Sequence, residues 1–215
     1  MNRPDFSNYV AHFTSVSGDI KSGQTPENFK EKAKMSAKQK LINILQEKKI
    51  YSTPMPWTHA KATCFTECPW SSLLAHTNRY SPYGIGFSKP FIFSRNGGPA
   101  IYIRPDHYFE QLNERKFVRH LWPFVTMFAP PYRPEWMIER YKDKGIIDCD
   151  YSHEREWRVP HDLSFDYKDI EFVILKSYDD MAKFPQELKD VIGREKFILM
   201  DNYKFVEKLW PVHKL

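Results

Sequence analysis

Two glutamates in the last third of the chain have the spacing best suited to chemistry. Glu154 and Glu156 flank Arg155 in the segment EREWRV (154–159), which we interpret as a strand ending at Pro160. Residues two apart on a strand share a face, so the two carboxylates would lie side by side. Such carboxylates repel and raise each other's pKa unless a cation or ligand lies between them. The pair predicts either a catalytic acidic site or solvated glutamates on an edge strand that are salt-bridged to arginine.

A histidine and a threonine near the start of the chain form a second candidate. His12 and Thr14 lie on either side of Phe13 in a predicted strand over 8–14. Their side chains would share one face while Phe13 points to the other. The pattern fits a polar pair that faces a cleft and equally a half-exposed strand edge.

The third candidate segment, 76–84, places an arginine and two tyrosines just before a predicted strand with two glycines, YGIGFS (83–88). Glycines in a strand let another group approach the backbone closely. The rings of Tyr80 and Tyr83 could stack on a flat heterocycle, with Arg79 beside them. The alternative is a tight turn in which a tyrosine packs on Pro82.

Metal chemistry has weaker support. Cys64 and Cys68 with His59 or His76 could bind zinc, but the spacing is uncommon and there is no second cysteine pair, so buried thiols are favoured. A nuclease would need acidic residues that gather a metal, and the candidates are Asp148, Asp150, Glu154 and Glu156. Walker, GxGxxG, HExxH and GxSxG signatures are absent. We expect no metal.

The elements that must position these residues are short strands mixed with helices. We predict strands at 8–14, 62–66, 83–88, 100–103, 154–159, 170–175 and 197–200. We predict helices at 37–48, 69–76, 107–128 with a break at Pro123, 135–143, 179–191 and 202–209. This pattern indicates the α+β class: one domain over 1–215 with a mixed or antiparallel central sheet and peripheral helices.

Composition supports a globular chain. Of its 215 residues, 41% are hydrophobic and 27% are charged, which excludes a wholly disordered protein. No apolar run reaches the roughly 18–20 residues of a membrane span, and no apolar stretch follows Met1–Asp5 as in a secretory signal. Three cysteines suit a reducing compartment. We therefore expect a cytoplasmic protein without membrane contact.

The order of several motifs resembles the AbiGi-type family of phage abortive-infection proteins. The resemblance runs from about residue 8 to 176, and its most specific parts are YGIGFSK (83–89) and EREWR (154–158). The motifs that carry the rest are HFT (12–14), LINIL (41–45), CFTE (64–67) and GGPAIYI (97–103).

The same order looks like a divergent ADP-ribosyltransferase of the DarT type. This resemblance implies an ADP-ribosyltransferase-like fold with NAD as substrate. It implies Glu156 as the catalytic residue, with Glu154 orienting the acceptor as in a Glu-x-Glu element. It implies NAD-binding roles for His12 and Thr14 on the ribose, for Tyr80 or Tyr83 on the nicotinamide and for Arg79 on the pyrophosphate. The Ser-Thr-Ser strand of such families has no clear counterpart here.

These roles suit the chemistry, because cleavage of the nicotinamide–ribose bond creates an oxocarbenium-like cation that a carboxylate stabilises. We expect the strands of His12 and Glu156 to meet in one sheet. The acceptor could be DNA, RNA or protein, and the net charge of +5 favours a nucleic acid. Residues that would then flank the cleft are Arg79, Lys89, Arg95, Arg155 and Arg158.

The resemblance also implies a toxin or antiphage effector, which would need a neutralising antitoxin or a tightly controlled trigger. The alternative is a non-catalytic binding module that senses a phage product, a partner protein or a nucleic acid. The two differ in whether His12, a tyrosine of 80–83 and Glu156 converge on one cleft.

Overall fold

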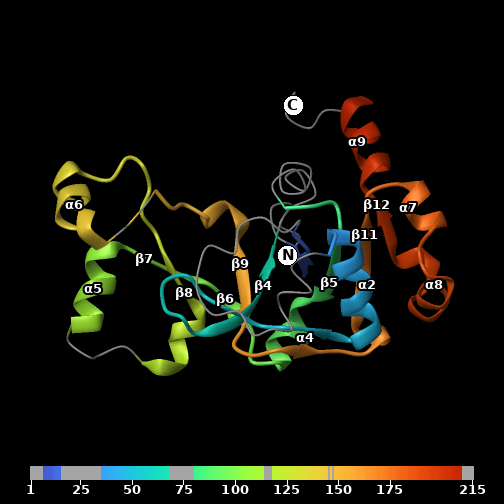
Figure 1. Ribbon diagram of the computed structural model, residues 1–215, viewed down its shortest axis with the longest axis horizontal. Helices are drawn as coiled ribbons and strands as arrows, with labels where there is room; N and C mark the ends of the chain where they lie inside the picture. The colour runs from blue at the N-terminus through green and yellow to red at the C-terminus, as the bar shows by residue number, and fades with distance from the viewer. Residues whose placement is uncertain are drawn as a thin grey trace. The chain divides into compact units, whose positions relative to one another are not determined.

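The computed structural model describes residues 7–15, 35–67, 80–113, 118–144, 146 and 148–209 (Figure 1). The chain forms two compact units: Met1–Ile50, Cys68–Phe91 and Ser164–Leu215 make the first, and Tyr51–Glu67 with Ile92–Leu163 the second. Both contain strands, most of them antiparallel, and helices, so the predicted α+β class is confirmed. One domain over 1–215 and an ADP-ribosyltransferase-like fold stay predictions.

The first unit is built on a sheet in the order β12-β11-β5-β1. Its elements are β1 (Tyr9–Phe13), α2 (Ala37–Glu47), β2 (Lys49–Ile50), β5 (Gly84–Ser88), η4 (Tyr167–Asp169), β11 (Ile170–Leu175), α7 (Tyr178–Ala182), α8 (Gln186–Ile192), η5 (Arg194–Lys196), β12 (Phe197–Leu199) and α9 (Met200–Leu209). The pairs β1–β5 and β5–β11 are antiparallel, and β11–β12 is parallel. The predicted strands at both ends of the chain are therefore confirmed.

Glycine in β5 permits close packing, as the sequence predicted. A Cβ built on Gly86 would lie 2.2 Å from the ring of Phe172, which comes from the neighbouring strand β11. The group that approaches this glycine is therefore a partly buried aromatic ring from the same sheet.

Helix α2 starts where the sequence predicted it. The Ser36 hydroxyl accepts a hydrogen bond from the Gln39 amide, and the Gln39 side chain accepts one from the Ser36 amide, which is a capping box. Ala37, Leu41 and Leu45 recur every four residues and are buried, so α2 packs one apolar face into the core.

The helix predicted at 179–191 is wrong as one element, because it forms two helices, α7 and α8, on either side of Pro185. Proline disfavours helical backbone in the residue before it, so α7 stops and Pro185 becomes the N-cap of α8. In Figure 1 both helices lie beside β11 and β12.

The second unit contains a sheet in the order β4-β9-β6, with β3 beside β4, and a separate pair β7–β8. Its elements are β3 (Thr53–Pro54), β4 (Lys61–Thr66), β6 (Gly98–Pro99), β7 (Ile101–Ile103), α5 (Pro105–Asn113), η1 (Arg119–Phe124), β8 (Val125–Met127), α6 (Glu135–Arg140), η2 (Lys142–Lys144), η3 (Ser152–Glu154) and β9 (Glu156–Val159). Two further elements, α4 (Lys89–Ser94) and β10 (Leu163–Ser164), lie where the chain passes between units.

The helix predicted over 107–128 is wrong in its last part, where Val125–Met127 forms strand β8. β8 pairs in parallel with β7, with Tyr102 opposite Thr126. Parallel strands need a crossover connection, and α5 supplies it. Tyr108 of α5 packs with Val125 and Met127 in one buried cluster, which fixes β8 against the helix. The helix predicted at 69–76 lies outside the described residues.

Candidate functional site

The strand that carries Glu156 begins two residues later than predicted. β9 starts at Glu156, while Glu154 ends the 3-10 turn η3. Between them Arg155 has a φ of 44°, in the left-handed region. A strand cannot continue through that conformation. The prediction that Glu154 and Glu156 share one face of a continuous strand is therefore wrong.

Glu156 is held by a buried arginine two residues further along β9. Arg158 Nε donates to Glu156 Oε1 at 2.9 Å, and Arg158 Nη2 donates to Oε2 at 2.8 Å. The Arg158 side chain is 4% exposed and the Glu156 side chain 12%. Two parallel charge-assisted bonds of this kind fix a carboxylate more firmly than a single ion contact does.

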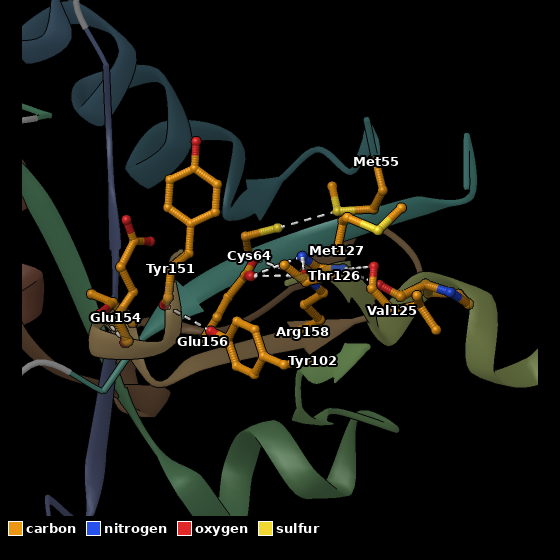
Figure 2. A network of polar contacts seen from close by, with 12 residues as sticks. Met55, Cys64, Tyr102, Val125, Thr126, Met127, Tyr151, Glu154, Glu156 and Arg158 are labelled. Carbon is orange, nitrogen blue, oxygen red and sulfur yellow. Dashed lines mark hydrogen bonds and ion pairs between the residues drawn. The ribbon is translucent and has the colours of Figure 1, made fainter. Parts of the chain in front are cut away.

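Strand β8 and the turn η1 complete the surroundings of Arg158. Its Nη1 donates to the carbonyl oxygens of Pro123 at 3.0 Å and Val125 at 2.9 Å, and its Nη2 donates to the Thr126 hydroxyl. The Thr126 hydroxyl is also 3.5 Å from Glu156 Oε2. Figure 2 shows this arrangement between β9 and β8. Burial lowers the pKa of Arg158, but Glu156 outweighs that effect and raises the pKa above its usual value.

Cys64 and Tyr102 lie close to the same carboxylate (Figure 2). Burial, and next the charge of Glu156, raise the pKa of the Cys64 thiol well above its usual value. Burial, with the nearby charge of Glu156, raises the pKa of Tyr102 to about 12. The Tyr102 hydroxyl donates to the carbonyl of Tyr151 at 2.9 Å. Both groups therefore stay protonated at neutral pH, so the Cys64 thiol is a poor nucleophile, although it is half-buried and not buried as predicted.

Glu154 is buried in the same unit, 8% exposed. Its carbonyl accepts a hydrogen bond of 2.6 Å from the Thr66 hydroxyl, and its charge contributes to the raised pKa of both Cys64 and Tyr102. The alternative of solvated glutamates is therefore wrong for this pair, but the salt bridge to arginine that belonged to it is confirmed for Glu156, which pairs with Arg158.

The first unit holds the predicted NAD-binding residues. His12 lies in β1 opposite Ile85 and is half-buried. Thr14 follows β1 and is buried, and its hydroxyl donates to the Ala37 carbonyl at 2.9 Å and lies 3.2 Å from the Tyr83 carbonyl. The structure therefore brings Thr14 and Tyr83 together and uses the Thr14 proton within the fold.

Tyr83 is anchored by an aspartate that the sequence did not single out. Its hydroxyl donates to Asp180 Oδ2 at 2.8 Å, and Lys38 Nζ donates to Asp180 Oδ1 at 2.8 Å. Burial, together with the hydrogen bond to Asp180, raises the pKa of Tyr83 well above its usual value. Burial raises the pKa of Asp180, but bonds from Lys38 and Tyr83 outweigh it and lower that pKa overall. Tyr80 is half-buried, and Arg79 lies outside the described residues.

His12, Thr14, Tyr80 and Tyr83 thus belong to the first unit, while Glu154 and Glu156 belong to the second. Their convergence on one cleft stays a prediction. Five basic residues were predicted to flank the cleft on the surface. For Arg158 and Lys89 this prediction is wrong, because both are buried. Arg95 and Arg155 are exposed.

Sequence reasoning missed Tyr102, Thr126 and Asp180. Tyr102 and Thr126 come from strands whose pairing joins segments more than twenty residues apart, and Asp180 meets Tyr83 from almost a hundred residues away. The alternation Glu156-x-Arg158 is the one local signal that predicts a same-face ion pair.

No protein-family model, curated protein or solved structure matches this chain. Among the described residues, no group of three or more histidine, cysteine or acidic side chains could hold a metal ion. Within the same part of the chain, no helix has the length and apolar character needed to cross a membrane.

Proposed function

We propose that this chain is an NAD-dependent ADP-ribosyltransferase that acts as a toxin or antiphage effector, with Glu156 as its catalytic residue. The observation that carries the proposal is the state of Glu156, which is oriented by two hydrogen bonds from Arg158 while 12% of its side chain stays exposed. A carboxylate that is oriented before the substrate arrives needs no reorganisation as charge develops.

The reaction breaks the bond between nicotinamide and the ribose of NAD. The bonding electron pair leaves with nicotinamide, and the ribose carbon becomes an oxocarbenium-like cation. The Glu156 carboxylate stabilises that positive charge. A nucleophile on the acceptor then donates a lone pair to the same carbon and loses a proton, which gives an ADP-ribosylated acceptor and free nicotinamide. The step needs no metal and no oxidant.

The remaining roles follow the family resemblance, modified by the contacts of the first unit. The Tyr83 hydroxyl is bound to Asp180, so Tyr83 would act on nicotinamide through its ring. The buried Thr14 hydroxyl donates to the Ala37 carbonyl and would have to give up that bond to donate to ribose, while His12 keeps its proposed role on the ribose. In this proposal Tyr80 is the alternative stacking ring, Arg79 binds the pyrophosphate and Glu154 orients the acceptor.

Labelled NAD tests the proposal directly. The purified chain is incubated with NAD labelled in its adenylate half and with a cell extract, and the labelled product is treated with nuclease or with protease. We expect label in macromolecules, removed by nuclease if the acceptor is DNA or RNA. Glu171→Gln, on the exposed face of β11, is the matched control for Glu156→Gln. If the wild-type chain neither consumes NAD nor transfers label, the transferase proposal fails and the binding-module alternative takes its place.

A further inference from the structure

Arg158 makes more contacts than an ion pair needs. Arginine has five N–H donors in a rigid plane. Here Nε and Nη2 donate to Glu156, Nη2 also donates to Thr126, and Nη1 donates to the carbonyls of Pro123 and Val125. Every donor thus has an acceptor. The acceptors come from β9, β8 and η1, so the guanidinium cannot rotate without breaking several bonds at once.

The fixed guanidinium of Arg158 in turn orients the Glu156 carboxylate. Because the guanidinium is fixed by main-chain carbonyls and meets Glu156 with two donors, it selects one orientation of that carboxylate. The Thr126 hydroxyl, bound to Arg158 and 3.5 Å from Glu156 Oε2, supports the same oxygen. Exposed ion pairs fluctuate and contribute little, but a guanidinium that is 4% exposed is a fixed part of the interior.

We propose that Arg158 is a positioning residue that holds the Glu156 carboxylate in its reactive orientation, with the Thr126 hydroxyl as its support. The inference rests on the proposed function for its effect on catalysis. Neither side chain needs to touch NAD. Substitution of Arg158 or Thr126 should therefore lower kcat with little change in KM for NAD, because only the alignment of Glu156 with the transition state is disturbed.

The structure offers a matched control for the damage that any change to a buried arginine causes. Arg133 has a side chain 7% exposed, and its Nη1 donates to the carbonyls of Ala129 and Pro130 and to Asp148. Arg133→Lys therefore disturbs a similar but smaller set of contacts, two main-chain carbonyls and one carboxylate, in the same unit while leaving Glu156 untouched. Lysine keeps the charge in both variants but loses the planar fork.

The test measures nicotinamide release from NAD by folded protein, well below the melting temperature. We expect Arg158→Lys to lower kcat by about 10–100-fold, the scale of a misplaced catalytic group, with KM for NAD changed less than about threefold. Arg133→Lys should melt earlier but keep its kcat. Unchanged kcat in folded Arg158→Lys, or an equal fall in Arg133→Lys, would overturn the inference.

Thr126 keeps the inference testable if Arg158→Lys does not fold. Thr126→Val removes the hydroxyl at nearly constant volume and should lower kcat several-fold, whereas Thr126→Ser keeps the hydroxyl and should restore it. Equal activities of the valine and serine variants would contradict the supporting role.

A readout without catalysis separates this inference from the proposed function. The Arg158 Nε–H signal in a ¹⁵N-edited NMR spectrum should exchange slowly with water, and faster in Glu156→Gln. If that proton exchanges as fast as an exposed arginine's, the fixed geometry is wrong whatever the activity. If the signal is protected but wild-type protein releases no nicotinamide, the proposed function fails, and with it the catalytic half of the inference.

Discussion

At the scale of single residues, two carboxylates organise their surroundings in opposite ways. Glu156 keeps part of its side chain exposed and is oriented from behind by Arg158. Asp180 instead collects donors from its own unit, namely Lys38, Tyr83 and Ser177, and joins α7 to α2 and to the residue just before β5. The first arrangement pairs the carboxylate with one buried cation, whereas the second uses the charge to hold elements together.

Asp180 therefore predicts an acid-dependent contribution to stability. Its pKa is lowered in the folded protein, so its stabilising effect is complete above the unfolded value of about 3.9 and is lost as the pH falls through the folded value. Asp180→Asn should reduce stability at pH 7 by about 1–3 kcal/mol, or roughly 2–4 °C in Tm for each kcal/mol. Thermal melts from pH 7 to pH 3 check this. A difference between wild type and variant that stays constant or grows in acid would contradict it.

At the scale of elements, the sequence predicts best where the signal is local. The Ser36–Gln39 capping box places the start of α2, and the apolar run 170–175 coincides with β11. β8 was missed because its strand conformation depends on β7, which lies more than twenty residues earlier. The break before β9 was missed because only the backbone angle of Arg155 reveals it.

The candidate site likewise combines features that the sequence can predict with features that only the fold determines. Its carboxylates and the same-face pair Glu156 and Arg158 can be read from residue type and alternation. The carbonyls of Pro123 and Val125 that fix the arginine cannot, because every residue has a carbonyl and only the fold selects which ones face a buried cation.

The packing of β5 against β11 gives a prediction at the same scale. A Cβ at Gly86 would lie 2.2 Å from the Phe172 ring, so Gly86→Ala should cost about 1–3 kcal/mol of stability through overpacking. Gly98→Ala is the control, because its Cβ would meet Phe124 at an ordinary 3.8 Å. Chemical denaturation of both variants measures the difference. Equal stabilities would show that Phe172 does not occupy this position.

At the scale of the whole molecule, the net charge of +5 bears on the acceptor. Arg95 and Arg155 are exposed and can contact phosphates, whereas Arg158 and Lys89 are buried and cannot extend a basic surface. If the acceptor is the nucleic acid that we propose, only a few phosphate contacts would hold it.

Salt dependence tests that acceptor. With about three phosphate contacts to a single strand, transfer of label to nucleic acid should fall roughly 10–100-fold between 50 and 200 mM salt, because releasing the same counterions gains less free energy at higher salt. Release of nicotinamide without acceptor should change little over this range, since no phosphate backbone takes part. Label found in protein, or transfer to nucleic acid that ignores salt, would count against a nucleic-acid acceptor.

The most direct measurement of the central claim is nicotinamide release by Glu156→Gln alongside NAD binding by the same variant. Glutamine keeps the volume of the side chain but not its charge, which matters only as the ribose cation forms. We predict that release falls by about two to three orders of magnitude, that NAD affinity changes less than about threefold, and that Glu171→Gln behaves as wild type. Full release by folded Glu156→Gln would contradict the account.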